Sequence, residues 1–360
     1  MMVFKATDVF QDQSLFIRAD ASHSIGEGHV MRCFAIAQSW MERGGKVTFV
    51  CKYLPLELED RLNKEGFRVS FINPNSIGDT DDAFQTGALA KANGCRCLIL
   101  DGYHFMSIYQ EILKNQGLKI VVVDDYGYAD FYWSDLILNK SLIAHTLSYS
   151  NKSDNTKLLL GPKYNILRKE FLSYKNKEHV LNTNVNEILV TFGGSDPDNV
   201  SSKILQYLDG SIQKQIKVKV VIGSGYRYMS ELKEQKKRVN YNLEIVRNAR
   251  NMAEIMYRSD VAISAGGTTL FELAYMGVPC LVVQIAANQK SAEIFGSTYG
   301  ACIYAGDVKN IGKVFFLEKL KEVFDMKRRK SMSNNGKLVV DGKGNERLMD
   351  EMANLLRDEI

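Results

Sequence analysis

The sequence lacks an apolar run long enough to cross a membrane, and it carries little net charge. Its 46 Lys and Arg against 42 Asp and Glu leave a formal charge of +4, which is too small to imply a nucleic acid or a membrane surface as a partner. Residues 1–14 contain Lys5, Asp8 and Asp12 and no continuous hydrophobic stretch, so we expect no signal peptide there. We also expect no nucleic-acid partner and no stable membrane contact.

The cysteine spacing that is typical of metal sites is absent as well, because only one residue separates Cys95 from Cys97 and no second pair follows. Most of the six cysteines fall inside apolar strand or helix patterns, as buried free thiols do. They are Cys33, Cys51, Cys95, Cys97, Cys280 and Cys302. We expect a reduced, cytoplasmic protein without a structural metal. The densest basic cluster, residues 327–330, lies in a helical pattern and is expected to be a solvated face.

Strand and helix patterns alternate along nearly all of the chain, which predicts parallel sheets covered by helices. A length of 360 residues is enough for two domains. A polar run at 174–186 predicts a linker, so we expect Rossmann-like domains at 1–174 and 187–340 and a C-terminal helix at 341–360 that packs back across them. The predicted fold class is α/β and GT-B-like, with two doubly wound Rossmann-like domains facing across a cleft. Strands are expected at 15–20, 46–51, 68–72, 97–101, 120–124, 136–138, 187–192, 218–222, 243–246, 261–264 and 280–284.

The sequence Gly266-Gly267-Thr268-Thr269 joins an apolar strand pattern to a helical pattern. Helix starts leave backbone N–H groups unpaired at the positive end of the helix dipole. Glycines let a ligand approach the backbone, and threonine hydroxyls add donors, so a diphosphate is the expected guest. Glu272, one turn into the helix, is expected to accept hydrogen bonds from a ribose. The alternative is a turn that simply requires small residues.

A second glycine-flanked helix start contains Gly26, Gly28, His29 and Arg32. It is not a dinucleotide fingerprint, because Arg32-Cys33 stands where the third glycine belongs. The positive end of a helix dipole disfavours an imidazolium, and a neutral imidazole beside a bound diphosphate can accept a proton from water. His29 is therefore the candidate catalytic base, the alternative being that it caps or packs at the turn.

Further candidates follow other strands. Asp20, Asp101 and Tyr103 lie at strand ends that face the expected cleft, although Asp101 suits a helix cap equally well. Asp124 and Asp125 start a loop, where carboxylates more often cap and turn than bind a metal.

Three loops of the second half complete the set. Gly194 and Ser195 are expected to contact phosphate or to form a plain turn. The backbone from Val246 to Ala249 is expected to pair with a flat uracil edge. The amides of Asn288 and Gln289 suit sugar hydroxyls or a helix cap.

Taken in order, these motifs resemble the UDP-sugar hydrolases of pseudaminic acid biosynthesis (PseG type), which are related in fold to MurG-like GT-B glycosyltransferases. The resemblance runs from about residue 15 to about residue 310. It is carried by Gly26-x-Gly28-His29-x-x-Arg32, Asp101-Gly102-Tyr103, Gly161-x-x-Tyr164, Phe192-Gly193-Gly194-Ser195-Asp196, Gly266-Gly267-Thr268-Thr269-x-x-Glu272 and Asn288-Gln289.

The resemblance implies hydrolysis of UDP-2,4-diacetamido-2,4,6-trideoxy-β-L-altropyranose to UDP and the free sugar, by anomeric C–O cleavage with inversion. It implies that His29 orients or deprotonates the attacking water, and it implies no metal and no cofactor. The implied partners are UDP and the UDP-linked diacetamido sugar. The implied substrate contacts are Asp20, Gly26, Gly28, Arg32, Tyr103, Gly194, Ser195, Val246, Ala249, Gly266, Gly267, Thr268, Thr269, Glu272, Asn288 and Gln289.

Three alternatives stay open from the sequence. A GT-B glycosyltransferase would use the same donor site with an acceptor other than water. A hydrolase would act on a related UDP-diacetamido sugar. A non-catalytic module would bind a nucleotide sugar without turnover.

Overall fold

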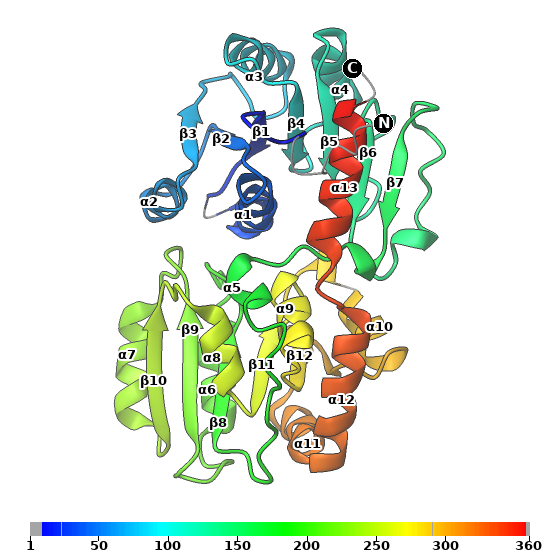
Figure 1. Cartoon of the computed structure of the whole chain (residues 1–360). Helices are drawn as coiled ribbons and strands as arrows, with labels where there is room; N and C mark the ends of the chain where they lie inside the picture. Colours follow the sequence, from blue (N-terminus) through cyan, green and yellow to red (C-terminus); the bar gives the residue numbers. More distant parts are fainter. Residues whose placement is uncertain (1–8, 23, 290, 358–360) are drawn as a thin grey trace. The chain divides into compact units, whose positions relative to one another are not determined.

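The computed structural model of the chain describes residues 9–22, 24–289 and 291–357, which form two compact units (Figure 1). The described residues up to Lys169 and from Lys343 onward build the first unit, and those within Glu170–Gly342 build the second. Each unit is a parallel sheet flanked by helices, so the prediction of two doubly wound α/β domains is confirmed.

The sheet of the first unit has the strand order β3-β2-β1-β4-β5-β6-β7. Its strands are β1 (Ser14–Ala19), β2 (Lys46–Cys51), β3 (Arg68–Phe71), β4 (Cys97–Asp101), β5 (Lys119–Val123), β6 (Leu136–Asn139) and β7 (Lys157–Leu160). Its helices are α1 (Gly28–Met41), α2 (Leu56–Lys64), α3 (Thr80–Ala92), α4 (Ser107–Asn115), the short η1 (Ala144–Thr146) and η2 (Pro162–Tyr164), and α13 (Gly344–Arg357). The order reverses between β1 and β4, which is where doubly wound sheets bind ligands.

The sheet of the second unit has the order β10-β9-β8-β11-β12-β13 and reverses between β8 and β11. Its strands are β8 (Glu187–Thr191), β9 (Lys217–Ile222), β10 (Asn242–Arg247), β11 (Val261–Ala265), β12 (Cys280–Gln284) and β13 (Ile303–Asp307). Its helices are α6 (Val200–Leu208), α7 (Met229–Arg238), α8 (Met252–Arg258), α9 (Thr268–Met276), the short η3 (Ala287–Gln289), α10 (Ser291–Ser297), α11 (Lys313–Phe324) and α12 (Met326–Val339), and α5 (Lys169–Leu172) begins at the boundary.

The central strands are continuous apolar runs because both faces of each sheet are covered. In β1, Leu15 and Ile17 belong to one buried cluster, whereas Phe16 belongs to a second cluster on the opposite face. Successive side chains of a strand point to opposite faces, so only a strand buried on both sides needs apolar residues throughout.

The last helix, α13, packs within the first unit although it ends the chain (red in Figure 1). Leu348, Met349 and Met352 lie in the same buried cluster as the residues of α1. The amide of Asn345 donates to Ser39 Oγ at 2.8 Å and to the Leu167 carbonyl at 2.9 Å, which fixes the start of the helix on this unit.

Three sequence expectations differ from the structure. The polar run at 174–186 belongs to the second unit, because His179 Nε2 lies 3.0 Å from the Ser259 carbonyl and Asn182 donates to Asp260. The sequence patterns do not predict the short strands β7 and β13, since each offers only a few apolar residues. In the basic cluster, Arg329 is buried and donates to two backbone carbonyls, whereas its neighbours are exposed as expected.

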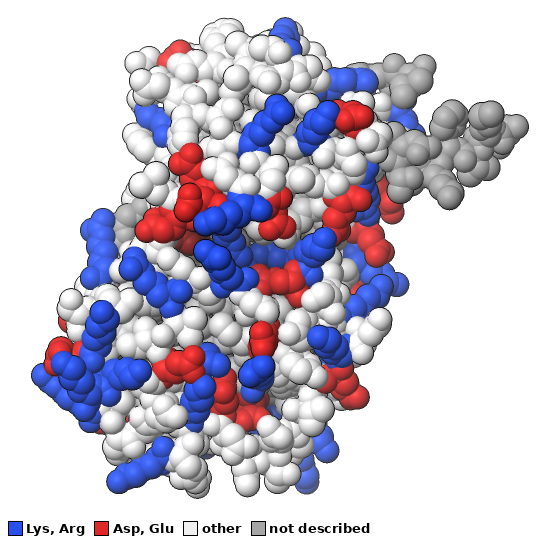
Figure 2. Space-filling view, turned by 60° about the vertical axis from the view of Figure 1, so that its left-hand side comes forward, with Lys and Arg blue, Asp and Glu red and all other residues white. Residues whose placement is uncertain are grey.

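Charges of both signs are interspersed over the face of the molecule shown in Figure 2. Within the described ranges, no helix is both long and apolar enough to span a membrane.

The position of α13 predicts that truncating Leu348 destabilises the first unit. Leu348→Ala removes a side chain with 0% exposure and is expected to lower the unfolding free energy by about 2–5 kcal/mol. Leu56→Ala, at a position of the first unit that is 77% exposed, is the matched control and should have little effect. Both tryptophans, Trp40 and Trp133, belong to the first unit, so tryptophan fluorescence during urea unfolding reports on this unit alone. Equal midpoints for the two variants would contradict the packing of α13.

Candidate functional site

His29 and Asp101 meet at the point where the strand order of the first sheet reverses. Gly28 begins α1 after the loop that follows β1, and Asp101 is the last residue of the neighbouring strand β4. His29 Nδ1 lies 2.6 Å from Asp101 Oδ1. The His29 side chain is 14% exposed and the Asp101 side chain 0%, so solvent reaches the imidazole but not its acidic partner.

Arg32, one helical turn after His29, connects this pair to a second carboxylate. It donates to Asp101 through Nε and Nη2 at 2.5 and 2.6 Å, and through Nη1 to both oxygens of Asp125 at 2.8 Å. Cys33 adds a thiol contact to Asp101 at 3.3 Å. Two carboxylates therefore share one guanidinium, and these charge-assisted hydrogen bonds offset the cost of burying the Asp101 charge.

The protonation state of Asp101 determines which nitrogen of His29 is available for chemistry. Burial alone would raise the pKa of Asp101, but Arg32 and then His29 hold it well below its ordinary value. An ionised carboxylate only accepts hydrogen bonds, so Nδ1 of His29 carries the proton in this pair. Nε2 is then the acceptor of a neutral imidazole, as a general base requires. Arg32 Nη2, 3.3 Å from Nδ1, faces the same Asp101 oxygen and is a neighbouring donor rather than the partner of Nδ1.

Tyr103 contacts both Asp125 and His29. Its hydroxyl donates to Asp125 Oδ2 at 2.7 Å, and its ring meets the His29 ring edge-on with centroids 5.0 Å apart. The candidate residues His29, Arg32 and Tyr103 are thus brought together. Arg32 is 7% exposed and saturated by carboxylates, which favours a positioning role over the expected substrate contact.

Gly26, Gly28 and Asp20 lie near the same strand end. Gly26 adopts a φ of +80° and donates its N–H to the Ser22 carbonyl, a conformation that favours glycine. Gly28 is exposed at the start of α1. Asp20 is 4% exposed, accepts from Arg18 at 2.6 Å and accepts from the backbone N–H groups that follow β2. These bonds favour a structural role for Asp20, and its substrate contact stays a prediction.

The Gly266–Thr269 loop follows β11, beside the point where the second sheet reverses. Gln289 organises it: one amide oxygen accepts from Gly266 N at 3.2 Å and from Ile285 N at 3.1 Å, which joins the ends of β11 and β12. Gly267 is the N-cap of α9 and has no side chain that could cap the first amides. Thr268 and Thr269 are half-buried at the helix start, and phosphate binding at this terminus stays a prediction.

The loop after β8 differs from the α9 loop, because the carboxylate of Asp196 already occupies the start of the helix that follows. Asp196 accepts from Val200 N and Ser201 N at 2.8 Å, so its carboxylate caps α6. Gly194 packs tightly against Gly223, where an added Cβ would lie 2.4 Å from the Gly194 Cα. Gly194 and Ser195 therefore sit at the strand end adjacent to the α9 loop, but the start of α6 is not open to phosphate.

The remaining candidates lie around the same sheet edge. Val246 lies near the end of β10, and Ala249 follows a turn in which Asn248 has a φ of +53°. Glu272 is 6% exposed on α9. The backbone of Asn288 lies in η3, and its side chain is outside the part of the chain that the structure describes. Asn288 and the uracil and ribose contacts stay predictions.

Sequence reasoning missed the partners of His29. The local sequence suits a helix cap at Asp101 as well as a place in the cleft and favours a turn at Asp125, yet both carboxylates bind Arg32. The available signal was their position: β1, β4 and β5 are neighbours in the sheet, and both carboxylates end or follow one of these strands. Asp124 does form the expected turn, since it accepts from three successive N–H groups.

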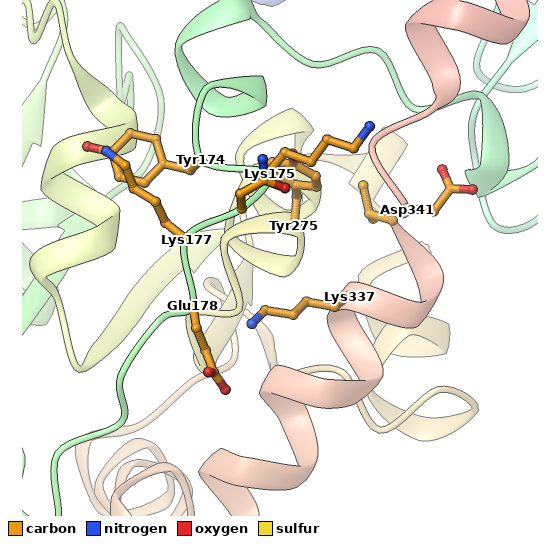
Figure 3. A pocket seen from close by; sticks show the side chains of 9 residues that line it. Tyr174, Lys175, Lys177, Glu178, Tyr275, Lys337 and Asp341 are labelled. Atoms are coloured by element: carbon orange, nitrogen blue, oxygen red, sulfur yellow. The ribbon is translucent and has the colours of Figure 1, made fainter.

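A pocket of about 400 Å³ in the second unit is a weaker candidate (Figure 3). It is lined by Tyr174, Lys175, Asn176, Lys177, Glu178, Tyr275, Lys337, Val340 and Asp341. Figure 3 shows Lys175 and Lys177 extending in opposite directions, and the Lys177 ammonium lies 4.2 Å from the Tyr174 ring centroid. The lysines therefore do not converge on a common ligand position. Among the described residues, no group of three or more His, Cys, Asp or Glu side chains is arranged to hold a metal ion.

The two adjacent glycines of the α9 loop are predicted to differ in their tolerance of alanine. A Cβ at Gly266 would lie 2.6 Å from the Cβ of buried Ala292, whereas the nearest atom to a Cβ at Gly267 is the Gln289 amide nitrogen at 3.7 Å. We expect Gly266→Ala to destabilise the loop by about 1–3 kcal/mol through overpacking, and Gly267→Ala to leave stability nearly unchanged. Hydrogen exchange measured on peptides spanning 261–276 tests this, and equal protection in both variants would refute it.

The Asp101–Arg32 pair predicts a pH-dependent contribution to stability. Because the folded-state pKa of Asp101 is lowered, its contribution is present above the unfolded value of about 4 and is lost as the pH falls below it. Asp101→Asn is expected to cost about 3–5 kcal/mol at pH 7, since it removes a charge from a buried pair. The difference from wild type should shrink below about pH 4, measured by urea unfolding at several pH values. If the difference in unfolding free energy between wild type and Asp101→Asn stays constant down to about pH 3, the substitution acts through the shape of the side chain rather than through its charge.

Comparison with known proteins gives a family match for the second half of the chain and relatives that cover most of it. Residues 188–347 match the model of the glycosyltransferase family 28 C-terminal domain. The chain is 27% identical over 357 residues to the spore coat polysaccharide biosynthesis protein SpsG of Bacillus subtilis, covering 96% of this chain and 99% of that protein.

Two other relatives are longer proteins. The chain is 28% identical over 289 residues to an uncharacterized protein of Methanocaldococcus jannaschii, covering 78% of this chain and 57% of that protein. It is 26% identical over 275 residues to a Helicobacter pylori protein named pseudaminic acid cytidylyltransferase and UDP-2,4-diacetamido-2,4,6-trideoxy-beta-L-altropyranose hydrolase, covering 76% of this chain and 44% of that protein. The chain thus spans about half of the length of these two relatives.

Among solved structures, MurG of Acinetobacter baumannii superimposes with a TM-score of 0.64 at 13% identity, over 94% of this chain and 98% of MurG. This likeness confirms the predicted GT-B-like fold. The chain therefore combines the GT-B fold with a second unit that is similar to the C-terminal domain of family 28 glycosyltransferases.

Proposed function

We propose that this chain hydrolyses a UDP-linked 2,4-diacetamido-2,4,6-trideoxy sugar and releases UDP and the free sugar. The β-L-altropyranose named for the H. pylori relative is the proposed substrate, and a closely related diacetamido sugar is the alternative. The observation that carries the proposal is the His29–Asp101 pair, in which an ionised carboxylate orients a solvent-accessible imidazole.

In the proposed reaction, Nε2 of His29 takes a proton from a water molecule as the water oxygen bonds to the anomeric carbon. The bond between the anomeric carbon and the phosphate oxygen breaks, and its electron pair leaves with UDP. A single displacement of this kind inverts the anomeric configuration. Asp101 stabilises the imidazolium that forms, because its carboxylate lies 2.6 Å from Nδ1.

The leaving diphosphate gains negative charge as the bond breaks. We propose that the amides at Gly267–Thr269 and the start of α9 receive this charge, since no side chain of Gly267 caps them. A donor of this kind typically lowers the barrier by about 3 kcal/mol.

The second candidate is a glycosyltransferase, and the match to the family 28 domain and the likeness to MurG favour it. The same base would then deprotonate an acceptor hydroxyl in place of water. The two candidate functions differ in whether the anomeric carbon reacts when no acceptor is supplied. A hydrolase turns over in water alone, and a transferase requires the acceptor.

The experiment is incubation of the purified protein with the UDP-linked altropyranose in ¹⁸O water, followed by mass spectrometry and NMR. We expect UDP without label, and a free sugar that carries ¹⁸O at its anomeric position and first appears with inverted configuration. Label on the phosphate of UDP would show P–O cleavage and overturn the proposed step. Absence of turnover until an acceptor is added would favour the transferase.

The role of the pair is tested by substitution. His29→Ala and Asp101→Asn are each expected to lower kcat by roughly 10²–10⁴-fold, the usual contribution of a general base, while UDP affinity stays the same. His145→Ala, at an exposed histidine of the first unit, is the matched control and should turn over normally. An unchanged kcat in His29→Ala would remove His29 from the mechanism.

A further inference from the structure

Tyr126 is an exposed aromatic side chain beside the His29 cluster, and the proposed reaction as described does not use it. Its side chain is 43% exposed although it follows the buried strand β5. Exposed single aromatics are common on protein surfaces and need no explanation by themselves. The case for Tyr126 rests on what it contacts and on how it is held.

The backbone that carries Tyr126 is fixed by a turn rather than a loose loop. Asp124 Oδ1 accepts from the N–H groups of Asp125, Tyr126 and Gly127 at 2.5, 2.8 and 3.0 Å. Asp124 is itself 0% exposed. A buried carboxylate therefore fixes the backbone that carries the exposed ring, and a fixed backbone reduces the entropy lost when a ligand packs on the ring.

The ring of Tyr126 is also linked to His29 through a chain of ring contacts. The centroids of Tyr126 and Tyr103 are 4.8 Å apart, and those of Tyr103 and His29 are 5.0 Å apart. Tyr103 in turn is fixed through its hydroxyl by Asp125, the residue before Tyr126. His29, Tyr103 and Tyr126 thus form a row, which we call the aromatic row, with the candidate base at one end and the exposed ring at the other.

We propose that Tyr126 is the stacking surface for the sugar of the substrate and determines specificity for deoxy and acetamido sugars. This inference rests on the proposed function. The aromatic row would place the pyranose so that its anomeric carbon lies toward His29 and its apolar edge lies on Tyr126.

The chemistry of the sugar explains why an aromatic ring fits this place. A 6-deoxy sugar presents a methyl group where glucose carries a hydroxymethyl group, and each acetamido group adds a further methyl. These groups gain from burial against an aromatic face, whereas a hydroxyl loses hydrogen bonds to water. A ring at this position therefore favours a trideoxy diacetamido sugar over a more hydroxylated one.

The experiment compares Tyr126→Ala and Tyr126→Phe with wild type, using the UDP-linked diacetamido altropyranose, UDP-N-acetylglucosamine and UDP as probes. Calorimetry in the His29→Ala background, where turnover is expected to be slow, gives Kd for each probe, and turnover assays with His29 intact give kcat and KM. Phe84→Ala, which removes an aromatic ring that is 59% exposed on α3, is the matched control. Thermal unfolding of each variant establishes that it folds.

For Tyr126→Ala we expect Kd and KM for the diacetamido sugar nucleotide to rise roughly 2- to 10-fold, the range of a single aromatic contact. The value of kcat should change much less, because stacking is made equally in the ground state and the transition state. UDP affinity should not change, and the preference over UDP-N-acetylglucosamine should fall. Tyr126→Phe keeps the ring and is expected to restore most of the affinity.

Three results would overturn the inference. One is an unchanged Kd for the diacetamido sugar nucleotide in Tyr126→Ala, and another is an equal loss of affinity for UDP. The third is a Tyr126→Phe variant that is as weak as Tyr126→Ala, since the hydroxyl would then be the important group. If wild type binds the sugar nucleotide but does not hydrolyse it, the hydrolase proposal fails, and the Kd comparison still decides the role of Tyr126.

Discussion

The Arg32 guanidinium, held between Asp101 and Asp125, is the interaction on which the arrangement of the first unit's site depends. Each carboxylate also binds a second side chain, because Asp101 orients His29 and Asp125 holds the Tyr103 hydroxyl. Without the guanidinium, two neighbouring carboxylates would repel each other and one of them would become protonated. A protonated Asp101 would compete as a donor with His29 Nδ1. The tautomer of the proposed base is therefore set by a residue that need not touch the substrate.

The sequence was sufficient for the elements that hydrophobic periodicity and glycine placement control. The alternating strands, the two helix starts and the doubly wound class were predicted because buried parallel strands read as continuous apolar runs. The short strands β7 and β13 were missed because a run such as Lys157–Leu160 carries no periodicity of its own and is a strand only through pairing with β6. The burial of Arg329 was missed because no local pattern reveals that the carbonyls of Asn182 and Thr183 would accept its protons.

The candidate site likewise has one part that local sequence patterns reveal and one part that they do not. Local patterns singled out His29 and the α9 loop as candidates, since both combine glycine with a helix start. The partners were not predictable locally, because Asp101 lies 72 positions after His29 and Asp125 lies 93 after Arg32. Only the strand order makes them neighbours. The contrast between α6 and α9 also required the structure: both follow a Gly-Gly pair, but Asp196 caps the start of α6 and a glycine stands at the start of α9.

The proposed reaction uses one electrostatic feature of each unit. In the first unit, one guanidinium faces two carboxylates, so these three side chains together carry a net negative charge. In the second unit, the start of α9 offers positive partial charge that the glycine at its N-cap does not neutralise. The proposed base would deprotonate water or a sugar hydroxyl in the same way. The GT-B framework therefore does not by itself separate hydrolase from transferase, and that distinction has to come from the groups around His29 that admit water or an acceptor.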